Sequence, residues 1–437
     1  MKLLTFKGGT HPPEKKELAK DKALLRMDPP QFVYVFLSNH AGAPAKPVVK
    51  ENDTVKTGQI IGEPGGFISA YLHSPVTGVV RKIDKLYHPV QGRPMEAIVI
   101  ERTSEDDWQL LDHSEWESLS KEQLLEVIKK AGIVGLGGAM FPTHVKLNPP
   151  AGKTIDTFIV NGAECEPYLT VDHRLMLEQA EDLVLGVKIV MKILGTKKAY
   201  IGVESNKMDA YEHLKRLCSD SSIEVVLLRT KYPQGAEKQL IYAITNRKVP
   251  VGGLPMDVGV VVQNVQTVIA IKRAVVDRKP LIERALTITG EAINNPMNVI
   301  ARIGTTIQQL VDFAGGLKED AEKLIMGGPM TGIAVNRLDL PILKGTLGIT
   351  VLSHEAEPIK KPCIRCTKCV VSCPMGLQPY LLYLLGNKRK YDQAVEEGLM
   401  ACIECGVCAY VCPSRIDHVR VIKLTKKVYQ ALRGGKK

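Results

Sequence analysis

The sequence contains Cys363-Ile-Arg-Cys-Thr-Lys-Cys-Val-Val-Ser-Cys-Pro374, in which four cysteines and a proline are spaced C-x2-C-x2-C-x3-C-P. The same spacing returns at Cys402-Ile-Glu-Cys-Gly-Val-Cys-Ala-Tyr-Val-Cys-Pro413. This run binds [4Fe–4S] clusters in bacterial ferredoxins that carry two clusters. Three thiolates so close in sequence can bind three corners of one cluster, and the fourth cysteine follows one helical turn later. The two copies therefore predict a domain that holds two [4Fe–4S] clusters.

Two other uses of cysteine fit this pattern less well. Structural zinc sites usually pair two C-x2-C knuckles and do not place three cysteines in one run. A disulfide framework is typical of small secreted domains, whereas this chain has 437 residues. Iron–sulfur clusters are therefore the favoured interpretation.

A resemblance to the two-cluster ferredoxins also implies which cysteines share a cluster. In those ferredoxins the fourth cysteine of each run binds the cluster of the other run. By this resemblance, cluster 1 is bound by Cys363, Cys366, Cys369 and Cys412, and cluster 2 by Cys402, Cys405, Cys408 and Cys373. Residues 381–385 and 392–399, between the runs, have helical character, which indicates a helical ferredoxin and not the compact β-hairpin kind.

Length and composition limit the remaining possibilities. A chain of 437 residues is too long for one hydrophobic core, so two to four domains are expected. Of the ten cysteines, Cys165 and Cys218 lie outside the two runs, and we expect both to be reduced thiols in a reducing compartment. The first residues are too short an apolar run for a signal peptide, and no uninterrupted apolar stretch reaches the roughly 20 residues of a membrane span. We therefore expect a chain that is soluble by itself.

The formal net charge of +11 is concentrated near the C-terminus. Nucleic acid is not the expected partner, because aromatic residues make up 5% of the chain and no recognised nucleic-acid module occurs. The basic residues of the last segment are Arg415, Arg420, Lys423, Lys426, Lys427, Arg433, Lys436 and Lys437. Helical spacing there predicts an amphipathic basic helix with Val421, Leu424, Val428 and Leu432 on its apolar side. A helix packed on the cluster domain is favoured, and contact with an acidic partner or a membrane surface is the alternative.

The N-terminal part of the chain is typical of a small β domain that follows an arm. Residues 1–30 mix charge and proline and are expected to form an extended arm. Residues 31–115 have the texture of an all-β domain, with strands expected at 32–37 and 96–100. Two of its segments resemble the halves of a biotinyl or lipoyl carrier domain. Residues 65–69, at the hairpin tip, include no lysine, so we expect a barrel-sandwich scaffold without a swinging prosthetic arm.

An α/β domain is expected over residues 116–280, after a polar linker. Ser120 and Gln123 form a capping box for a helix that ends near Lys130. Strands are expected at 157–160, 199–203 and 223–228, and helices at 173–194, 208–217 and 235–245. This alternation indicates a Rossmann-like domain with a mostly parallel sheet.

Glycines and polar side chains gather where strands give way to helices in this domain. The loop from Gly132 to Phe141 places four glycines ahead of Lys146. Glycines let backbone N–H groups converge on phosphate oxygens, and a lysine neutralises the charge. Three more polar segments, 161–167, 232–237 and 263–267, lie at the corresponding junctions. Since the carboxyl ends of parallel strands collect ligand-binding groups, these segments predict one nucleotide site.

The order of these four motifs resembles the FMN- and NADH-binding subunit of respiratory complex I. The whole chain, from GGTHPPE near its start to the two cysteine runs, is similar to the C subunits of Rnf-type ion-translocating ferredoxin:NAD oxidoreductases. The resemblance implies FMN contacts at Gly135, Gly137, Gly138, Lys146, Asn161, Glu164 and Asn264, and NADH contacts at Phe141, Glu166 and Glu237. Ala163 and Ala236 depart from the complex I pattern, which has aspartate and glutamate there.

The same resemblance implies a function. The chain would be an NADH-linked flavin and iron–sulfur oxidoreductase subunit that passes electrons between NAD(H), FMN and two [4Fe–4S] clusters. No protein side chain is expected to act as a catalytic residue, because the redox cofactors carry the chemistry. The implied partners are the membrane subunits of the same complex, with ferredoxin as the ultimate redox partner through other subunits. The implied location is peripheral, on the cytoplasmic side of the cell membrane.

Two further domains complete the expected organisation. Residues 281–350 resemble the soluble-ligand-binding β-grasp domain that follows the flavin domain in the same families, with strands expected at 286–289, 299–303 and 323–326 and a helix at 307–313. Its expected role is that of a spacer between the flavin domain and the clusters. Residues 351–437 are expected to form the two-cluster ferredoxin domain with the basic C-terminal helix.

Three other functions remain open at this point. A cobalamin reductase of the kind associated with microcompartments uses similar flavin, β-grasp and cluster modules, although the N-terminal position of the β domain favours the Rnf type. A non-catalytic adaptor that carries clusters but no flavin is the second. Binding of nucleic acid by the basic tail is the third, and its affinity would fall steeply with salt.

Overall fold

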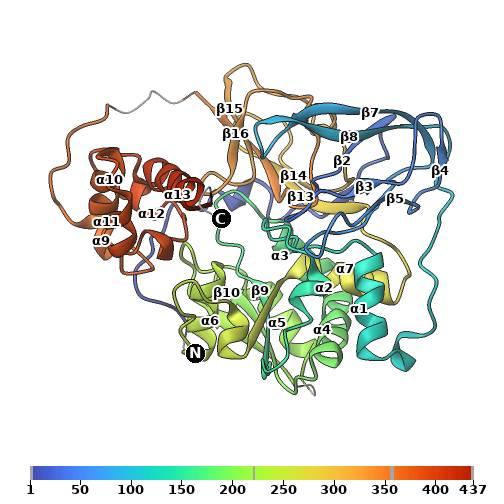
Figure 1. Cartoon of the computed structure of the whole chain (residues 1–437), viewed down its shortest axis with the longest axis horizontal. Coiled ribbons are helices and arrows are strands. Elements are labelled where there is room, and N and C mark those ends of the chain that lie inside the picture. Colours follow the sequence, from blue (N-terminus) through green and yellow to red (C-terminus); the bar gives the residue numbers. More distant parts are fainter. Residues whose placement is uncertain (1–2, 220–221, 355–358, 435–437) are drawn as a thin grey trace.

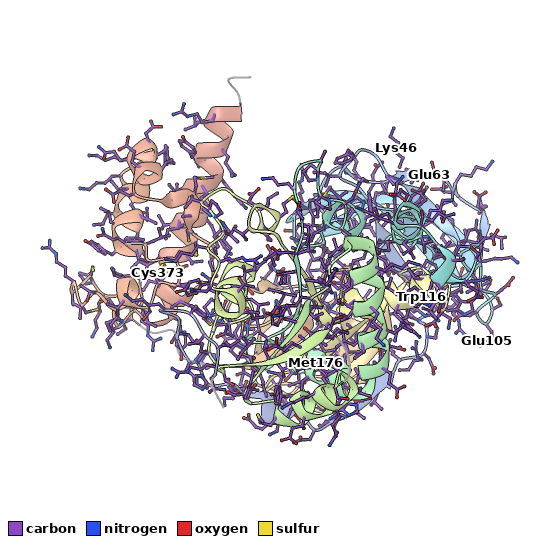
Figure 2. The ribbon with its side chains drawn as sticks, turned by 90° about the horizontal axis from the view of Figure 1, so that it is seen from below. Lys46, Glu63, Glu105, Trp116, Met176 and Cys373 are labelled. Atoms are coloured by element: carbon purple, nitrogen blue, oxygen red, sulfur yellow. The ribbon has the colours of Figure 1, made fainter. Side chains whose placement is uncertain are left out.

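The computed structural model describes residues 3–219, 222–354 and 359–434, which form four groups of elements (Figure 1). Green α/β elements occupy the lower half of the figure, and two β domains lie above them. The red helices of the C-terminal domain form a lobe at the left. In Figure 2 this lobe, which carries Cys373, stands at one side, and Glu105 and Trp116 lie toward the opposite side. The chain is thus a mixed α/β protein with several domains.

The N-terminal β domain consists of two small sheets around one core. The first has the strand order β2-β8-β7-β4, with β2 Phe32–Phe36, β4 Thr54–Val55, β7 Gly78–His88 and β8 Arg93–Arg102. The second has the order β3-β5-β6, with β3 Lys46–Pro47, β5 Ile60–Glu63 and β6 Leu72–His73. Side chains that alternate along the strands bury Val33 and Ile98 against Ile61 and Leu72. Both strands predicted for this domain are present.

The α/β domain is built on a parallel sheet with the order β11-β10-β9-β12. Its strands are β9 Thr157–Gly162, β10 Ala199–Glu204, β11 Ile223–Leu228 and β12 Val260–Asn264. Its helices include α1 Lys121–Lys130, α2 Thr143–Lys146, α5 Met208–Leu217, α6 Glu237–Thr245 and α7 Val265–Val275, with 3-10 turns η2 Trp116–Ser118 and η3 Pro255–Val258. Ser120 and Gln123 make both hydrogen bonds of the predicted capping box. The alternation of strands and helices predicted from the sequence is confirmed.

One predicted helix of this domain is two helices in the structure. The segment 173–194 is divided into α3 Val171–Glu178 and α4 Ala180–Leu194, and Gln179 between them has φ −131° and ψ 34°. No proline or glycine marks the break, so the apolar period of the sequence runs through it. The break is stabilised from outside the segment, because Arg273 donates to Oε1 of Gln179 at 3.0 Å. The predicted end of the helix at Gly195, which has φ 67°, is confirmed.

A six-stranded mixed sheet forms the second β domain, which we call the six-stranded domain. Its order is β1-β14-β13-β17-β15-β16. The strands are β1 Leu24–Arg26, β13 Glu283–Thr289, β14 Met297–Arg302, β15 Ala321–Met326, β16 Ile333–Val335 and β17 Gly348–Ser353, and its helix is α8 Ile307–Phe313. The predicted N-terminal arm is more ordered than expected. It contains η1 Lys16–Leu18 and supplies β1, which pairs in parallel with β14 and so occupies an edge that would otherwise be unpaired.

The C-terminal domain is helical, as predicted. Its elements are α9 Lys368–Val371, α10 Pro379–Asn387, α11 Tyr391–Glu396, η4 Leu399–Ala401, α12 Val407–Tyr410 and α13 His418–Gly434. Its core is small, with Leu382, Ala394, Leu399 and Ile422 as its buried apolar residues. No helix in the described ranges 3–219, 222–354 and 359–434 has both the length and the apolar character needed to cross a bilayer.

The basic C-terminal helix is present as α13, but its predicted apolar side is correct only in part, because Val421 and Val428 are partly buried and the two leucines are not. Leu424 and Leu432 are 61% and 57% exposed, whereas Ile422 and Thr425 are buried. The helix packs along α10, and this contact turns a different face of α13 inward than the spacing of its larger apolar residues indicated. Lys436 and Lys437 lie outside the described residues.

Candidate functional site

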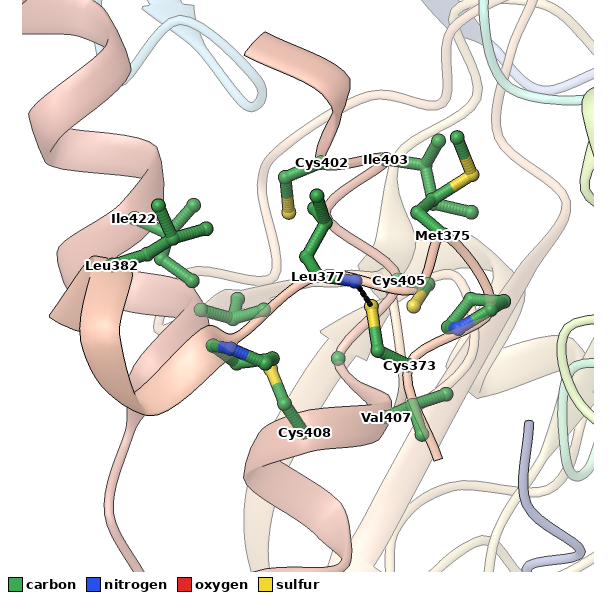
Figure 3. A pocket seen from close by; sticks show the side chains of 14 residues that line it. Cys373, Met375, Leu377, Leu382, Cys402, Ile403, Cys405, Val407, Cys408 and Ile422 are labelled. Atoms are coloured by element: carbon green, nitrogen blue, oxygen red, sulfur yellow. Dashed lines mark hydrogen bonds between the residues drawn. The ribbon is translucent and has the colours of Figure 1, made fainter. Parts of the chain in front are cut away.

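Four cysteines from the two runs line one cavity of the C-terminal domain, which we call the inner cavity (Figure 3). They are Cys402, Cys405 and Cys408 from the second run and Cys373 from the first. Their side chains turn toward a common space, and the N–H of Leu377 donates to Sγ of Cys373 at 3.4 Å. Apolar side chains surround them, including those of Leu377, Leu382, Val407 and Ile422.

The remaining four cysteines line a second cavity, the outer cavity. They are Cys363, Cys366, Cys369 and Cys412, so each cavity combines three cysteines of one run with the last cysteine of the other. Cys363 and Cys366 are exposed, whereas Cys408 of the inner cavity is buried. The two cavities therefore differ in their access to solvent, and the outer one reaches the protein surface.

Both cavities suit a cluster better than a single metal ion. Within the described part of the chain, no three His, Cys, Asp or Glu side chains converge as the ligands of one ion would. A [4Fe–4S] cluster instead needs four thiolates spread around a larger space. Burial raises the pKa of the Cys405 thiol to about 11, so binding of iron there must release the proton that the free thiol holds at neutral pH.

The inner cavity faces the α/β domain. The hydroxyl of Tyr232, which is buried, donates to the main-chain oxygen of Cys405 at 2.7 Å. Nε2 of Gln239 on α6 donates to the main-chain oxygen of Pro374 at 3.3 Å. The N-terminal arm joins the same contact, because the N–H of Gly9 donates to the oxygen of Ser372 at 2.8 Å. Sequence reasoning did not identify Tyr232 as a contact to the cysteine runs, since no local pattern reports a bond across 173 residues.

The glycine loop of the α/β domain is closed by its own backbone. The N–H of Gly135 donates to the oxygen of Phe141 at 2.8 Å, and the N–H of Met140 donates back to Gly135 at 3.0 Å. Gly137 lies against Asn264, since a Cβ at Gly137 would stand 3.2 Å from Cβ of Asn264. Gly138 has φ +102° and open space where a side chain would be. The loop therefore leaves an exposed glycine backbone at the end of the sheet, which a phosphate-bearing ligand could approach.

Three predicted FMN residues lie at the carboxyl end of the parallel sheet. Asn161 on β9 and Asn264 on β12 are direct partners in the strand register. Both oxygens of the buried Glu164 side chain accept backbone N–H groups at the start of α3, from Asp172 at 2.8 Å and from His173 at 3.4 Å. Asp172 in turn accepts from Asn264 at 2.7 Å, and burial raises the pKa of both carboxyl groups. The structure thus links Glu164 and Asn264 through Asp172, whereas the side chain of Asn161 next to them donates to the oxygen of Gly235 at 2.8 Å.

The other predicted nucleotide residues are divided between two places. Nζ of Lys146 forms an ion pair with Oε1 of Glu237 at 2.6 Å, so a predicted FMN residue holds a predicted NADH residue. Glu166 instead lines a cavity of about 180 Å³ together with Gly137 and Gly138. Phe141 is not among the described residues that line this cavity.

This cavity, which we call the glycine-lined cavity, is built by three domains. The α/β domain contributes the residues just named, and Val90 at the tip of the β7–β8 hairpin comes from the N-terminal β domain. The α/β domain also contributes Met140 and Leu169, and the rest of the wall comes from the six-stranded domain and the segment before β17. Among its lining residues there are Gly327, Gly328, Thr331, Gly332 and Gly345. The sequence indicated a spacer for this domain, and the structure shows in addition that it forms part of a cavity wall.

Sequence reasoning also missed two buried cations that tie this site together. The fully buried Arg284 on β13 donates to the oxygens of Leu136 and Gln266 at 3.4 and 3.2 Å, so it connects the glycine loop to the six-stranded domain. Nζ of the buried Lys344 donates to the oxygens of Tyr71 and Gly132, each in a different domain. Lys344 is a charged residue in an otherwise apolar segment, and that was the signal the sequence offered for it, whereas Arg284 directly follows Glu283.

Four parts of the chain match known families. Residues 4–105 match the family described as RnfC Barrel sandwich hybrid domain, and residues 128–273 match the Nuo51 FMN-binding domain. Residues 286–334 match the SLBB domain, and residues 358–413 match the 4Fe-4S dicluster domain.

Relatives of known name match most of the chain. The C subunit of the proton-translocating ferredoxin:NAD(+) oxidoreductase complex of Clostridium ljungdahlii is 47% identical, over 90% of this chain and 87% of its own length. The C subunit of the Na(+)-translocating ferredoxin:NAD(+) oxidoreductase complex of Acetobacterium woodii is 46% identical, over 91% and 90%. The C subunit of the ion-translocating oxidoreductase complex of Rhodobacter capsulatus is 38% identical, over 92% and 78%.

Among solved structures, a chain of an NAD+-reducing [NiFe]-hydrogenase in the H2-reduced state has a similar fold. The TM-score is 0.51 at 18% identity, over 72% of this chain and 66% of that chain. At this level of identity the similarity concerns the fold alone.

Proposed function

Because this chain belongs to the family of C subunits of ion-translocating ferredoxin:NAD(+) oxidoreductase complexes, we propose that it links NAD(H) to two [4Fe–4S] clusters through FMN. It is an electron-transfer subunit of such an oxidoreductase, with an FMN-binding domain and a 4Fe-4S domain. The observation that carries the proposal is the series of sites along the molecule. The glycine-lined cavity, the inner cysteine cavity and the outer cysteine cavity follow one another from the α/β domain to the surface of the C-terminal domain.

The two cavities support the proposed ligand sets of the clusters. Cys402, Cys405, Cys408 and Cys373 bind cluster 2 in the inner cavity, and Cys363, Cys366, Cys369 and Cys412 bind cluster 1 in the outer cavity. Cluster 2 is the one next to the α/β domain, because Tyr232 and Gln239 contact its loops. Cluster 1 is the one that meets the next redox partner, because Cys363 and Cys366 are exposed.

FMN is held at the carboxyl end of the parallel sheet. The proposed contacts are Gly135, Gly137, Gly138, Lys146, Asn161, Glu164 and Asn264, of which Asn161 and Asn264 are register partners. Bound FMN exchanges a hydride with NAD(H) and single electrons with clusters. Phe141, Glu166 and Glu237 are the proposed dinucleotide contacts, and Glu166 is supported by its place in the glycine-lined cavity. The residues present fit the group, since exposed glycines and amide side chains surround the end of the sheet.

Finer assignments of fold and surroundings belong to the same proposal. The parallel sheet is of the Rossmann-like kind, and the six-stranded domain is of the β-grasp kind. The partners are the membrane subunits of the complex, with ferredoxin acting through them, and the protein is peripheral on the cytoplasmic side of the membrane. The relatives, whose names state a complex with ferredoxin and NAD(+), support this assignment.

Cofactor stoichiometry on one anaerobic preparation tests the proposal. We expect about eight irons, eight acid-labile sulfides and one flavin per chain, as two [4Fe–4S] clusters and one FMN require. Addition of NADH should bleach the flavin band and then generate the low-temperature EPR signal of reduced clusters. Four irons, no flavin, or a flavin that NADH does not reduce would each contradict the proposal.

A further inference from the structure

The loop between β15 and β16, residues 327–332, holds the side chain of Glu166. The N–H of Met330 donates to Oε2 of Glu166 at 3.1 Å. The hydroxyl of Thr331 donates to Oε1, so each carboxylate oxygen has one partner from this loop. The six-stranded domain thus contacts a carboxylate that belongs to the end of the parallel sheet, in a segment 164 residues away.

The fit between the loop and Glu166 is close. A Cβ at Gly328 would lie 2.4 Å from Oε2 of Glu166, so a residue with a side chain at this position would displace the carboxylate. The loop is itself fixed, because the N–H of Gly332 donates to the oxygen of Gly328 at 2.9 Å. The hydroxyl of Thr350 on β17 donates to the oxygen of Gly327 at 2.8 Å. This is a loop whose shape is set by its own domain, and it leaves Glu166 little freedom to rotate.

The loop leaves some hydrogen-bond acceptor positions of the Glu166 carboxylate free. An ionised carboxylate has about four lone-pair positions, and the loop uses one on each oxygen. Glu166 also lines the glycine-lined cavity, into which the remaining positions can be directed. A carboxylate near the carboxyl end of a parallel strand can accept hydrogen bonds from the hydroxyls of a bound ribose. The carboxylate is therefore both held by the loop and available to a ligand.

We propose that Thr331 and the Met330 amide are positioning groups for the dinucleotide, which orient the Glu166 carboxylate toward a ribose or carboxamide donor of NAD(H). This inference rests on the proposed dinucleotide site. It assigns to the six-stranded domain a positioning role in substrate recognition, beyond that of a spacer. Because the same loop approaches Gly406 beside the inner cysteine cavity, where a Cβ at Gly406 would lie 3.0 Å from the oxygen of Met330, the loop stands between the dinucleotide and cluster 2.

The test compares Thr331→Val, which removes the hydroxyl at constant shape, with Thr331→Ser, which keeps it. The matched control is Thr289→Val in the same domain, because the buried hydroxyl of Thr289 has no partner among the described residues. NAD+ binding to each full-length protein, with flavin and clusters present, is measured by calorimetry. NADH-to-dye activity then gives kcat and KM separately.

We expect Thr331→Val to raise the Kd for NAD+ and the KM for NADH about tenfold, as the loss of a partner that orients a ligand-binding group typically does. The kcat value, flavin and iron contents should stay within twofold of wild type, and Thr331→Ser and Thr289→Val should bind NAD+ normally. Unchanged or tighter binding by Thr331→Val would overturn the inference, since the loop would then be a neutral wall or a competitor of the ligand. Failure of the wild-type protein to bind NAD+ would instead contradict the proposed dinucleotide site.

Discussion

Lys146 is the lysine that follows the glycine loop, and its charge is balanced by Glu237 at 2.6 Å. The phosphate of bound FMN would replace Glu237 as the partner of Lys146, or would bind Lys146 together with Glu237. We expect Lys146→Met to raise the Kd for FMN about ten- to hundredfold, because a charge-assisted hydrogen bond contributes about 1.5–3 kcal/mol. Iron content should not change, because the residue is remote in sequence and domain from the cysteines. Flavin fluorescence during dialysis against flavin-free buffer measures the effect.

The control for this variant is Lys129→Met on α1, whose ammonium contacts Glu126 at the surface. Equal retention of flavin by Lys146→Met and Lys129→Met would remove Lys146 from the site. Glu237→Gln should retain FMN, because it leaves Lys146 in place and frees its charge for the phosphate.

Tyr232 connects the α/β domain to a loop of the inner cysteine cavity through one hydrogen bond, from its hydroxyl to the oxygen of Cys405. Partners of this kind behind a ligand typically change affinity or activity about tenfold when removed. We expect Tyr232→Phe to slow reduction of the clusters by NADH about tenfold, with flavin reduction unchanged. Stopped-flow spectroscopy at the flavin and cluster bands separates the two steps. If Tyr232→Phe and the control Tyr200→Phe on β10 reduce their clusters at the wild-type rate, Tyr232 has no role in this transfer.

At the scale of elements, the last cysteine of each run lies in the cavity formed by the first three cysteines of the other run. Each last cysteine follows a short helix, α9 or α12, that carries it away from its own triplet and into the other cavity. The test begins with Cys402, Cys405 and Cys408 all replaced by alanine, which leaves one cluster. Adding Cys412→Ala should then abolish that cluster, and adding Cys373→Ala should leave it, by iron content and EPR. The reverse pattern would show that each run binds its own cluster.

Helix α13 presents an outward face that remains a candidate for docking. Lys427 and the exposed Leu424 lie on it, and Lys423 is partly exposed. Lys426 lies on the inward face of α13, because its Nζ donates to the oxygen of Cys402 at 2.6 Å and contacts Glu404. We expect Lys423→Glu with Lys427→Glu to weaken membrane association, since each basic residue near an anionic surface contributes about 1 kcal/mol. NADH-to-dye activity should be unchanged.

The matched control for the helix is a double reversal at exposed lysines of the N-terminal β domain, Lys46→Glu with Lys85→Glu. Sedimentation with membranes at several salt concentrations measures association. If the α13 variant stays on the membranes as well as the control does, this face of α13 faces solvent and does not dock. Lys426→Gln is a separate variant, and it should instead reduce the stability of cluster 2.

At the scale of the whole molecule, the domains differ in what stabilises them. The α/β domain contains a large hydrophobic core, whereas the C-terminal domain buries Leu382, Ala394, Leu399 and Ile422. A core so small cannot offset the chain entropy of a domain of this size without bound metal. Removal of the clusters by chelation under oxidising conditions should therefore unfold the C-terminal domain alone. Calorimetry should show that its transition is lost while the main transition keeps its temperature within a few degrees, and a common loss of both would contradict this.

The remaining domains are joined by buried charges. Arg284 connects the six-stranded domain to the glycine loop, and Lys344 bonds to the N-terminal β domain and to the α/β domain. Burial lowers the pKa of Lys344 to about 7, yet its carbonyl partners satisfy the ammonium as well as the neutral amine. Removing one partner of such a bond leaves a buried polar group unpaired, which is why these contacts fix the domains in one arrangement.

The sequence by itself determined the local elements and the kinds of ligand. Strand and helix periods, the capping box at Ser120 and the glycine at the end of α4 depend on neighbouring residues, so they could be predicted from short segments. The cysteine spacing likewise indicated clusters, because three thiolates within one loop can reach the same group. Three of the four nucleotide motifs could be placed together because they follow β9, β11 and β12, and the ends of parallel strands meet at one edge. The expectation that the glycine loop also follows a strand was wrong, because that loop joins helices α1 and α2.

The tertiary structure alone decided how these elements meet. The break at Gln179, the inward face of α13 and the hold of Thr331 on Glu166 each depend on residues from another segment. No period or spacing within a segment reports such a partner, because contacts between distant parts of a chain are set by how whole domains pack. The order of the two cysteine cavities has the same origin. Tyr232 lies beside Cys405 because the α/β domain packs against that side of the C-terminal domain, and this packing places one cavity inside and the other at the surface.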